Sequence, residues 1–385
     1  MINSQAALDN HFPEFMSTIA HCNWLRIVQA QTAIFVFLTV IVSGCATMST
    51  GETIPDSNEV VIEVLYATDR KIDNPDGVTD FYGGQRGELR YGTCQVAINP
   101  QKNGISGNAD EQLWGLDSEN TSHGEAELRQ IKELNPDTFT DYLSTRIAQA
   151  EDKSALVYIH GYAKAFEHAA KTTAKLTYEL SYRGIPILYS WPAKGSRAAY
   201  TGDMASMDWS TPHLQQFLDR LSAIHEVETI HLIAHSLGNR GLLNALRGLI
   251  NSNYPSKRWK FGEIVLIAPD VDKDIFERDI APQITQINSR ITLYVSSVDF
   301  PLFISRKLNL YPRVGDSSHK PLVYSGIETI DVSQTIGMQI GHTYFRKDPA
   351  VLSDLHFLIN ERQGADERPT LRAIDLPEGR YWQVR

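Results

Sequence analysis

The chain has 385 residues, a formal net charge of −10 and 42% hydrophobic residues, a balance typical of a globular protein. Asp and Glu (46) outnumber Lys and Arg (36), and no basic patch with interleaved aromatic residues occurs. Because nucleic acid is a polyanion, this charge argues against nucleic-acid binding. The length allows one large α/β domain or two small ones.

The first 45 residues are organised like a secretory signal. Arg26 precedes the apolar run 33–42, which is too short to span a bilayer, and small residues lead to Cys45. The Val-Ser-Gly-Cys ending resembles the lipobox of bacterial lipoproteins. That resemblance implies a lipid on Cys45 and a place in the bacterial cell envelope, facing the periplasm or the exterior. The alternative is a buried apolar segment with an incidental cysteine.

The sequence predicts three parts, a signal peptide over 1–45, a flexible tether over 46–58 and a single domain over 59–385. The tether is polar and rich in turn-forming residues. Together with a lipid it would hold the domain on a membrane without spanning it. Once the signal is removed and Cys45 carries a lipid, Cys94 is a single thiol and no intramolecular disulfide can form.

Past residue 59, short apolar runs alternate with longer helical patterns. The stretch 73–92 contains five glycines and predicts loops that feed an N-terminal hairpin, and 100–124 predicts a surface excursion. This alternation indicates an α/β fold with a mostly parallel, doubly wound sheet and helices on both faces. The predicted strands are 60–67, 155–160, 185–190, 228–234, 263–268, 291–296 and 329–332, and the predicted helices include 166–183, 211–225 and 237–250.

Ser236 stands where a predicted strand turns directly into a predicted helix. The turn reads Ala234-His235-Ser236-Leu237-Gly238. It has the pattern of a nucleophile elbow, in which crowding demands small residues two places before and two places after the serine. At a helix start, the Leu237 N–H would face a developing oxyanion. The alternative is that Ser236 is only a helix N-cap.

Three further positions supply partners for this serine. One predicted strand ends in His160-Gly161-Tyr162, where the Tyr162 N–H is the predicted second oxyanion donor. Another leads into Asp299, and His342 lies in a loop before a C-terminal helix. The order of serine, acid and histidine is the order found in α/β-hydrolases. Asp270, which follows the preceding strand, is the alternative acid.

The side-chain chemistry assigns a role to each member. A serine hydroxyl needs a base to take its proton, and histidine suits this because its pKa is about 6.5. We therefore predict Ser236 as the nucleophile, His342 as the base and Asp299 as the group that orients the histidine. Asp270, Asp272 and Asp274 resemble the start of a calcium loop, but the positions that need glycine and glutamate hold Ile275 and Ala281. No metal or cofactor is predicted.

With these residues in view, the chain resembles the α/β-hydrolase superfamily, and within it a bacterial esterase-like family that is catalogued as a domain of unknown function. The resemblance covers about residues 60–360. In that family Asn often follows the tyrosine of the oxyanion turn, whereas Ala163 follows it here. The motifs that carry the resemblance are Val64-Leu65-Tyr66-Ala67-Thr68-Asp69-Arg70, Arg90-Tyr91-Gly92, His160-Gly161-Tyr162, Tyr189-Ser190-Trp191-Pro192, the serine turn, Ala268-Pro269-Asp270 and Gly341-His342.

This resemblance implies a serine hydrolase, above all a carboxylic ester hydrolase of the esterase or lipase type that forms an acyl-enzyme. Its substrate would be a small ester or a lipid-like ester. Two alternatives stay open, an acyltransferase that uses the same triad and a catalytically silent binding protein of the envelope. Tyr162, Tyr189 and Trp191 are candidates for the pocket lining, and their rings fit a core position equally well.

Overall fold

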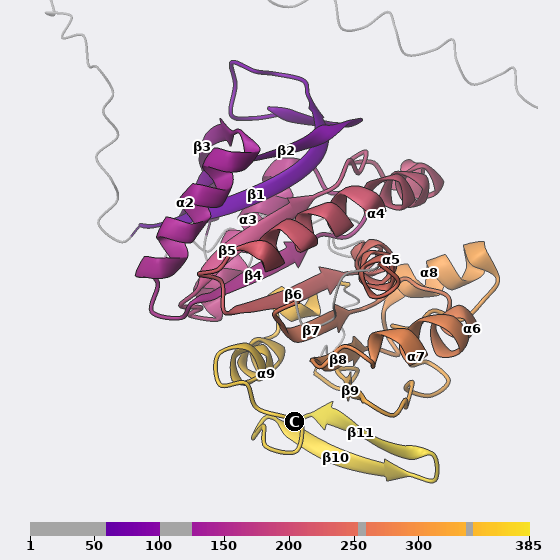
Figure 1. The fold of residues 1–385 in the computed structure, drawn as a ribbon. Coiled ribbons are helices and arrows are strands. Elements are labelled where there is room, and N and C mark those ends of the chain that lie inside the picture. The colour runs from indigo at the N-terminus through magenta and orange to yellow at the C-terminus, as the bar shows by residue number, and fades with distance from the viewer. Residues whose placement is uncertain (1–58, 101–124, 253–258, 336–341) are drawn as a thin grey trace, which may run out of the picture. The chain divides into compact units, whose positions relative to one another are not determined.

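An eleven-stranded sheet runs through the computed structural model, which describes residues 59–100, 125–252, 259–335 and 342–385 (Figure 1). All of these residues belong to one compact unit, Pro55–Arg385. The predicted signal peptide with Cys45, the tether and most of the predicted surface excursion lie outside the described residues. The predictions made for them therefore stay predictions.

The strands lie in the order β10-β11-β9-β8-β7-β6-β4-β5-β1-β2-β3. The inner strands from β11 to β1 all pair in parallel, whereas β10 at one edge and β2 and β3 at the other pair antiparallel. The predicted mostly parallel sheet is thus confirmed. The strands are β1 (Val60–Ile72), β2 (Tyr82–Asn99), β3 (Glu125–Leu134), β4 (Ser154–Ile159), β5 (Ile185–Ser190), β6 (Thr229–His235), β7 (Phe261–Ile267), β8 (Arg290–Val295), β9 (Ile327–Asp331), β10 (Leu371–Leu376) and β11 (Gly379–Val384).

Helices cover both faces of this sheet, as the sequence predicts. One hydrophobic cluster joins the sheet to α2, α4, α5 and α7, and the other joins it to α3 and α9. Within the described ranges, no helix is both long enough and apolar enough to cross a membrane. The helices are α2 (Pro136–Gln149), α3 (Phe166–Glu179), α4 (Tyr200–Ala223), α5 (Gly238–Ile250), α6 (Lys273–Ile275), α7 (Ala281–Ile284), α8 (Phe300–Asn309) and α9 (Pro349–Ile359).

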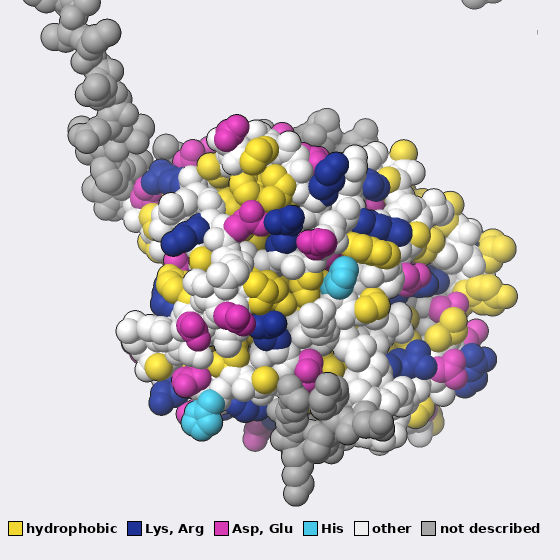
Figure 2. All heavy atoms as spheres, turned by 45° about the horizontal axis from the view of Figure 1, so that its top comes forward, with side chains coloured by type: hydrophobic (Ala, Val, Ile, Leu, Met, Phe, Trp, Pro, Cys, Tyr) yellow, Lys and Arg dark blue, Asp and Glu magenta, His cyan; other side chains and the backbone are white. Residues whose placement is uncertain are grey.

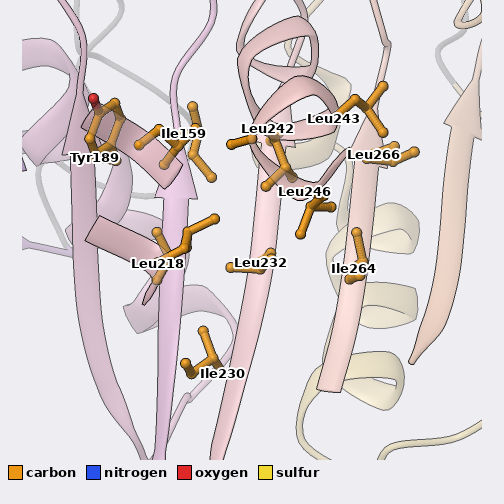
Figure 3. Packing of buried hydrophobic residues seen from close by; sticks show 14 of the residues in the cluster. Ile159, Tyr189, Leu218, Ile230, Leu232, Leu242, Leu243, Leu246, Ile264 and Leu266 are labelled. Carbon is orange, nitrogen blue, oxygen red and sulfur yellow. The ribbon is translucent and has the colours of Figure 1, made fainter. Parts of the chain in front are cut away.

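The spacing of apolar residues explains how α5 packs. Leu242, Leu243 and Leu246 fall on one side of the helix because three to four residues make one turn. They pack over the central strands, where Leu232 of β6 and Ile264 of β7 point toward them (Figure 3). Side chains two apart share a face of a strand, so this face is continuous and apolar. The packing holds the N-terminus of α5 at the end of β6.

Helix α4 begins earlier than the sequence predicts. The predicted helix starts at residue 211, next to Pro212, and a proline lacks an N–H and disfavours the interior of a helix. In the structure, α4 begins at Tyr200 and continues through Pro212. The Thr211 hydroxyl donates to the Met207 carbonyl at 3.0 Å, one of the local bonds beside the break in the ladder. Burial of apolar residues on both sides of the proline outweighs its cost.

The glycine-rich stretch 73–92 is only partly the loop region that the sequence predicts. Strand β2 begins at Tyr82, so most of these glycines lie inside a strand. A Cβ on Gly92 would overlap the Lys132 carbonyl of the neighbouring strand. Glycine here therefore permits close approach of two strands rather than a turn. The C-terminal hairpin of β10 and β11 was not predicted, because its strands are short and largely lack buried residues.

Glu263 at the start of β7 makes stability depend on pH. Its carboxylate accepts a bond from Arg290 at 2.8 Å, yet burial outweighs this attraction and raises its pKa to about 7. The folded state thus holds a proton that the unfolded chain releases above about pH 4.5. Raising the pH from about 4.5 to 8 should therefore lower the free energy of unfolding, relative to Glu263→Gln, by roughly 1–3 kcal/mol. Urea titrations of both proteins at several pH values measure this difference, and parallel pH profiles would contradict it.

Candidate active site

The predicted site residues gather at the carboxyl ends of the parallel strands. Ligands of open α/β sheets bind at this edge, because the loops that leave neighbouring strands meet there. Ser236 follows β6, Asp270 follows β7 and Asp299 follows β8. His342 follows β9 at a greater distance along the chain. Residues that are far apart in the sequence, but that follow neighbouring strands, thus lie close together.

Ser236 occupies a sharp turn between β6 and α5. Its φ is 53°, in the left-handed region that non-glycine residues adopt only when their surroundings enforce it. The Ser236 N–H donates to the Ile267 carbonyl at 2.9 Å, and its carbonyl accepts from the Asn239 side-chain amide at 3.0 Å. Asn239 also donates to Ile267 at 3.0 Å. These bonds tie the turn to the end of β7 and hold the strained conformation.

Two glycines allow the serine turn and the His-Gly turn to touch. A Cβ on Gly238 would lie 2.5 Å from the His160 carbonyl oxygen. A Cβ on Gly161 would lie 3.0 Å from the Cβ of Ser236. Both contacts are too close for a larger residue, so the requirement for small residues has a steric cause. Tyr162 follows Gly161 and Leu237 precedes Gly238, so both residues lie directly beside these close contacts.

His342 and Asp299 form a buried pair. The imidazole Nδ1 lies 2.7 Å from Asp299 Oδ2, and both side chains are almost inaccessible. The other carboxylate oxygen accepts the Leu302 N–H at 3.0 Å and so caps α8. Asp299 is held on both sides, which fixes the ring and leaves Nδ1 as its protonated nitrogen. His342 Nε2 is buried and has no hydrogen-bond partner within the described ranges.

His235 supports the loop that carries His342. Its Nε2 lies 2.9 Å from the His342 carbonyl oxygen, to which it donates. Burial, followed by the neighbouring His342, holds the pKa of His235 well below its usual value, so the ring is neutral. A neutral ring can donate this bond without burying a charge. His235 thus makes a structural contact in the serine turn.

Asp270 has partners other than the histidine. Its carboxylate accepts bonds from Tyr200 at 2.7 Å and from Arg313 at 2.9 Å, and also from Ser305. It therefore forms part of the pocket wall, whereas Asp299 contacts the imidazole. Among the residues that the structure describes, no group of three or more His, Cys, Asp or Glu side chains is placed to hold a metal ion.

A pocket of about 70 Å³ joins Ser236 to His342. Trp191 and Tyr189 are fully buried in the core and do not line it, which corrects the first of the two expectations for these rings. Tyr162 does line it. A wider hollow of about 350 Å³ between α2 and α4 contains neither serine nor histidine. The pocket residues are Tyr162, Tyr200, Ser236, Asp270, Pro301, Leu302, Ile304, Ser305, Leu308 and His342.

Arg70 holds the turn that begins at His160-Gly161-Tyr162, a role that the sequence did not predict. Its guanidinium uses all five N–H groups, and two of them hold the turn, one on the Lys164 carbonyl at 2.6 Å and one on His160 Nε2 at 3.3 Å. The others go to Ser190, Gly83 and Ala193. Burial lowers the pKa of Arg70 to about 10, so it stays charged at neutral pH. A charged pair at the end of an apolar strand, Asp69-Arg70, was the available signal.

The same turn has two more anchors. The Ala163 N–H donates to Asp203 at 2.9 Å, and Ala163 itself has a φ of 54°. Trp191 Nε1 donates to the His160 carbonyl at 2.8 Å and its ring stacks on the imidazole. The backbone between these residues is therefore fixed at both ends. A pre-organised turn of this kind is what an oxyanion donor requires.

Removing the Arg70 guanidinium should cost more than removing an exposed one. Arg70→Met leaves three carbonyls, the Ser190 hydroxyl and His160 Nε2 without this donor, so we expect the free energy of unfolding to fall by about 3–5 kcal/mol. The matched control is Arg129→Met, which breaks an exposed pair with Glu59 and should cost less than about 1 kcal/mol. Urea denaturation measures the loss of stability in both variants, and equal losses would contradict the role of Arg70 in holding this turn.

The chain is distantly similar to several solved structures. Aspergillus fumigatus lipase B is 12% identical, over 54% of this chain and 52% of that one, with a TM-score of 0.33. The chain thus spans about half the length of that lipase. A gene product of Listeria innocua is 11% identical, over 60% of this chain and 98% of that one, with a TM-score of 0.34. A lipase-esterase related protein of Clostridium acetobutylicum is 12% identical, over 54% and 93%, with a TM-score of 0.30.

A family model gives the stronger result. The model described as an alpha/beta hydrolase of unknown function (DUF900) matches residues 135–362, more than half of the chain. No curated protein matches the chain itself. The matched range contains the serine turn, both candidate acids and His342. With its doubly wound sheet and this match, the chain belongs to that family of α/β-hydrolases of unknown function.

Proposed function

We propose that the protein is a serine hydrolase that cleaves carboxylic esters through an acyl-enzyme. The observation that carries this proposal is the pairing of His342 Nδ1 with Asp299, which leaves the unpartnered Nε2 in the same pocket as Ser236. An imidazole held in this tautomer can accept a proton only at Nε2. The strained turn of Ser236 supports the same assignment, because strain of this kind concentrates at functional sites.

The proposed reaction has two halves. Ser236 Oγ attacks the ester carbonyl carbon while its proton moves to His342 Nε2, and that proton then passes to the leaving alcohol. Water attacks the acyl-enzyme, its proton moves to Nε2 and returns to Oγ, and the free acid leaves. The N–H groups of Leu237 and Tyr162 are the proposed oxyanion donors. Asp299 stabilises the imidazolium in both halves.

Covalent labelling tests the nucleophile directly. A fluorophosphonate should modify wild-type protein once, and peptide mapping should place the adduct on Ser236. Ser305→Ala, which removes another serine of the pocket, should be labelled as wild type is. The proposal fails if a control serine hydrolase is labelled under the same conditions and this protein is not. Product analysis with and without an added alcohol separates hydrolysis from acyl transfer.

We also propose that Cys45 carries a lipid and anchors the domain at the bacterial envelope. The support is the order of Arg26, the apolar run 33–42 and the small residues before Cys45. Metabolic labelling with a fatty acid should mark the wild-type chain and leave Cys45→Ser unmarked. Equal labelling of the two would reject the anchor.

A further inference from the structure

Exposed hydrophobic side chains gather beside the pocket. Among the described residues, eight large hydrophobic side chains are exposed, and six of these lie on α8, on its flanks or on α6. The Lys273 N–H of α6 donates to the Pro312 carbonyl at 3.0 Å, which joins α6 to the segment after α8. In Figure 2, hydrophobic side chains gather at the right-hand edge, the side on which α8 lies in Figure 1. We call these six the apolar rim: Ile275, Val298, Phe303, Leu308, Leu310 and Tyr311.

Leu310 is unfavourable for the stability of the isolated domain. It ends α8 with a φ of 64° and is 82% exposed. Glycine or asparagine is usual at such a position, because the left-handed conformation is unfavourable for other residues. A leucine that is both strained and exposed gains nothing from burial that would offset this cost. The combination points to a contact that the leucine makes outside its own chain.

The rim continues into the pocket. Helix α8 supplies five of the pocket residues, from Pro301 to Leu308. Leu308 belongs to both sets, since it lines the pocket and is 64% exposed. A surface in contact with the rim would therefore lie directly at the pocket entrance. An apolar chain that enters the pocket from that surface would contact the apolar side chains of α8 in the pocket wall.

Two basic groups lie beside Phe303, one of the two aromatic members of the rim. Lys307 Nζ lies 5.5 Å from the centre of the Phe303 ring and the Arg306 guanidinium lies 5.3 Å from it. Lys307 is exposed, and Arg306 pairs with Asp316 at 2.8 Å. Cations beside exposed aromatic and aliphatic side chains are typical of surfaces that sit at the headgroup level of a bilayer. The lipid phosphates complement these charges.

We propose that the apolar rim docks the domain onto a phospholipid surface, so that the pocket opens toward lipid. A protein partner of ordinary size would cover about 20–30 residues on each side, whereas a bilayer needs only a few apolar anchors. Cys45 precedes Glu59 by 14 residues, at most about 50 Å of extended chain, so a lipid there would keep the rim within reach of a membrane. The further statement, that the substrate is an ester presented from that surface, rests on the proposed function.

A fluorescent probe on the rim tests the docking without any need for activity. The full chain carries Cys22→Ser, Cys45→Ser and Ser236→Ala, and an environment-sensitive dye is attached through Leu310→Cys. Cys94 is buried and should not react. The matched control carries the dye through Val61→Cys, which replaces a 51% exposed residue of β1 outside the rim.

On addition of phosphatidylcholine vesicles with one-third phosphatidylglycerol, the dye at position 310 should shift to the blue and brighten several-fold. The dye at position 61 should not change. The proposal is overturned if the chain does not float with the vesicles. It is also overturned if the chain floats and position 310 stays unchanged, or if both positions respond alike.

A second measurement tests the link to the substrate. Asparagine suits the left-handed conformation, so the Leu310→Asn variant should fold. Because the substitution removes an apolar anchor, hydrolysis of a vesicle-bound long-chain ester should fall about tenfold. Hydrolysis of a monomeric short-chain ester should be unchanged, as should both rates in Val61→Asn. Equal loss on both esters would overturn the link. If wild type cleaves neither ester, the proposed function fails while the dye measurement still decides the docking.

Discussion

Ser236→Ala is expected to lower kcat on a short-chain carboxylic ester by about 10⁵-fold or more, because removing the nucleophile of a triad costs nearly as much as removing the whole triad. The residual rate should come from the oxyanion donors alone. Fold and stability should change little, since serine and alanine meet the same strain at a φ of 53°. The measurement is kcat for both proteins across a panel of acyl chain lengths.

Ser305→Ala is the matched control for this loss. Ser305 lines the same pocket, and its hydroxyl donates to Asp270 rather than facing His342. Its replacement should change kcat by less than about tenfold, in proportion to one lost hydrogen bond. If Ser236→Ala retains most of the wild-type rate, the assignment of the nucleophile is wrong. If kcat falls as far in Ser305→Ala as in Ser236→Ala, the loss in Ser236→Ala does not identify Ser236 as the nucleophile.

The two candidate acids should separate cleanly. Asp299→Asn keeps the size of the side chain but offers His342 an amide, which favours the wrong tautomer, and we expect kcat to fall about 10⁴-fold. Because Asp299 also caps α8 through the Leu302 N–H, stability should fall by only about 1 kcal/mol. Steady-state kinetics and a urea titration of the same preparation measure the two effects.

Asp270→Asn should lower the stability more than Asp299→Asn does, and kcat less. Its carboxylate is the buried partner of Arg313, so its loss leaves a cation unpaired and should lower the free energy of unfolding by about 3–5 kcal/mol. The kcat of the folded fraction should fall far less than in Asp299→Asn, since Asp270 bonds Tyr200, Ser305 and Arg313. A larger loss of kcat in Asp270→Asn than in Asp299→Asn would exchange the roles of the two acids.

Local pattern was enough for the parallel sheet and the serine turn. Strands buried on both faces must be almost wholly apolar, so β4, β5 and β6 stand out within a few residues of their true bounds. The turn at Ser236 needs small neighbours for steric reasons, so it too can be recognised from adjacent residues of the sequence. The C-terminal hairpin lacked such a signal because β10 largely lacks buried residues.

The sequence by itself determined the fold class, the turn at Ser236 and a short choice of partners, because each depends on residues close together in the chain. Only the tertiary structure decided between the two acids as partner of the histidine. Asp299 and Asp270 follow neighbouring strands alike, and the choice depends on where the loop with His342 returns to the sheet. The contacts of Arg70 were also decided by the tertiary structure, because its five acceptors come from three separate segments of the chain. Contacts between distant segments form only when the sheet brings them together.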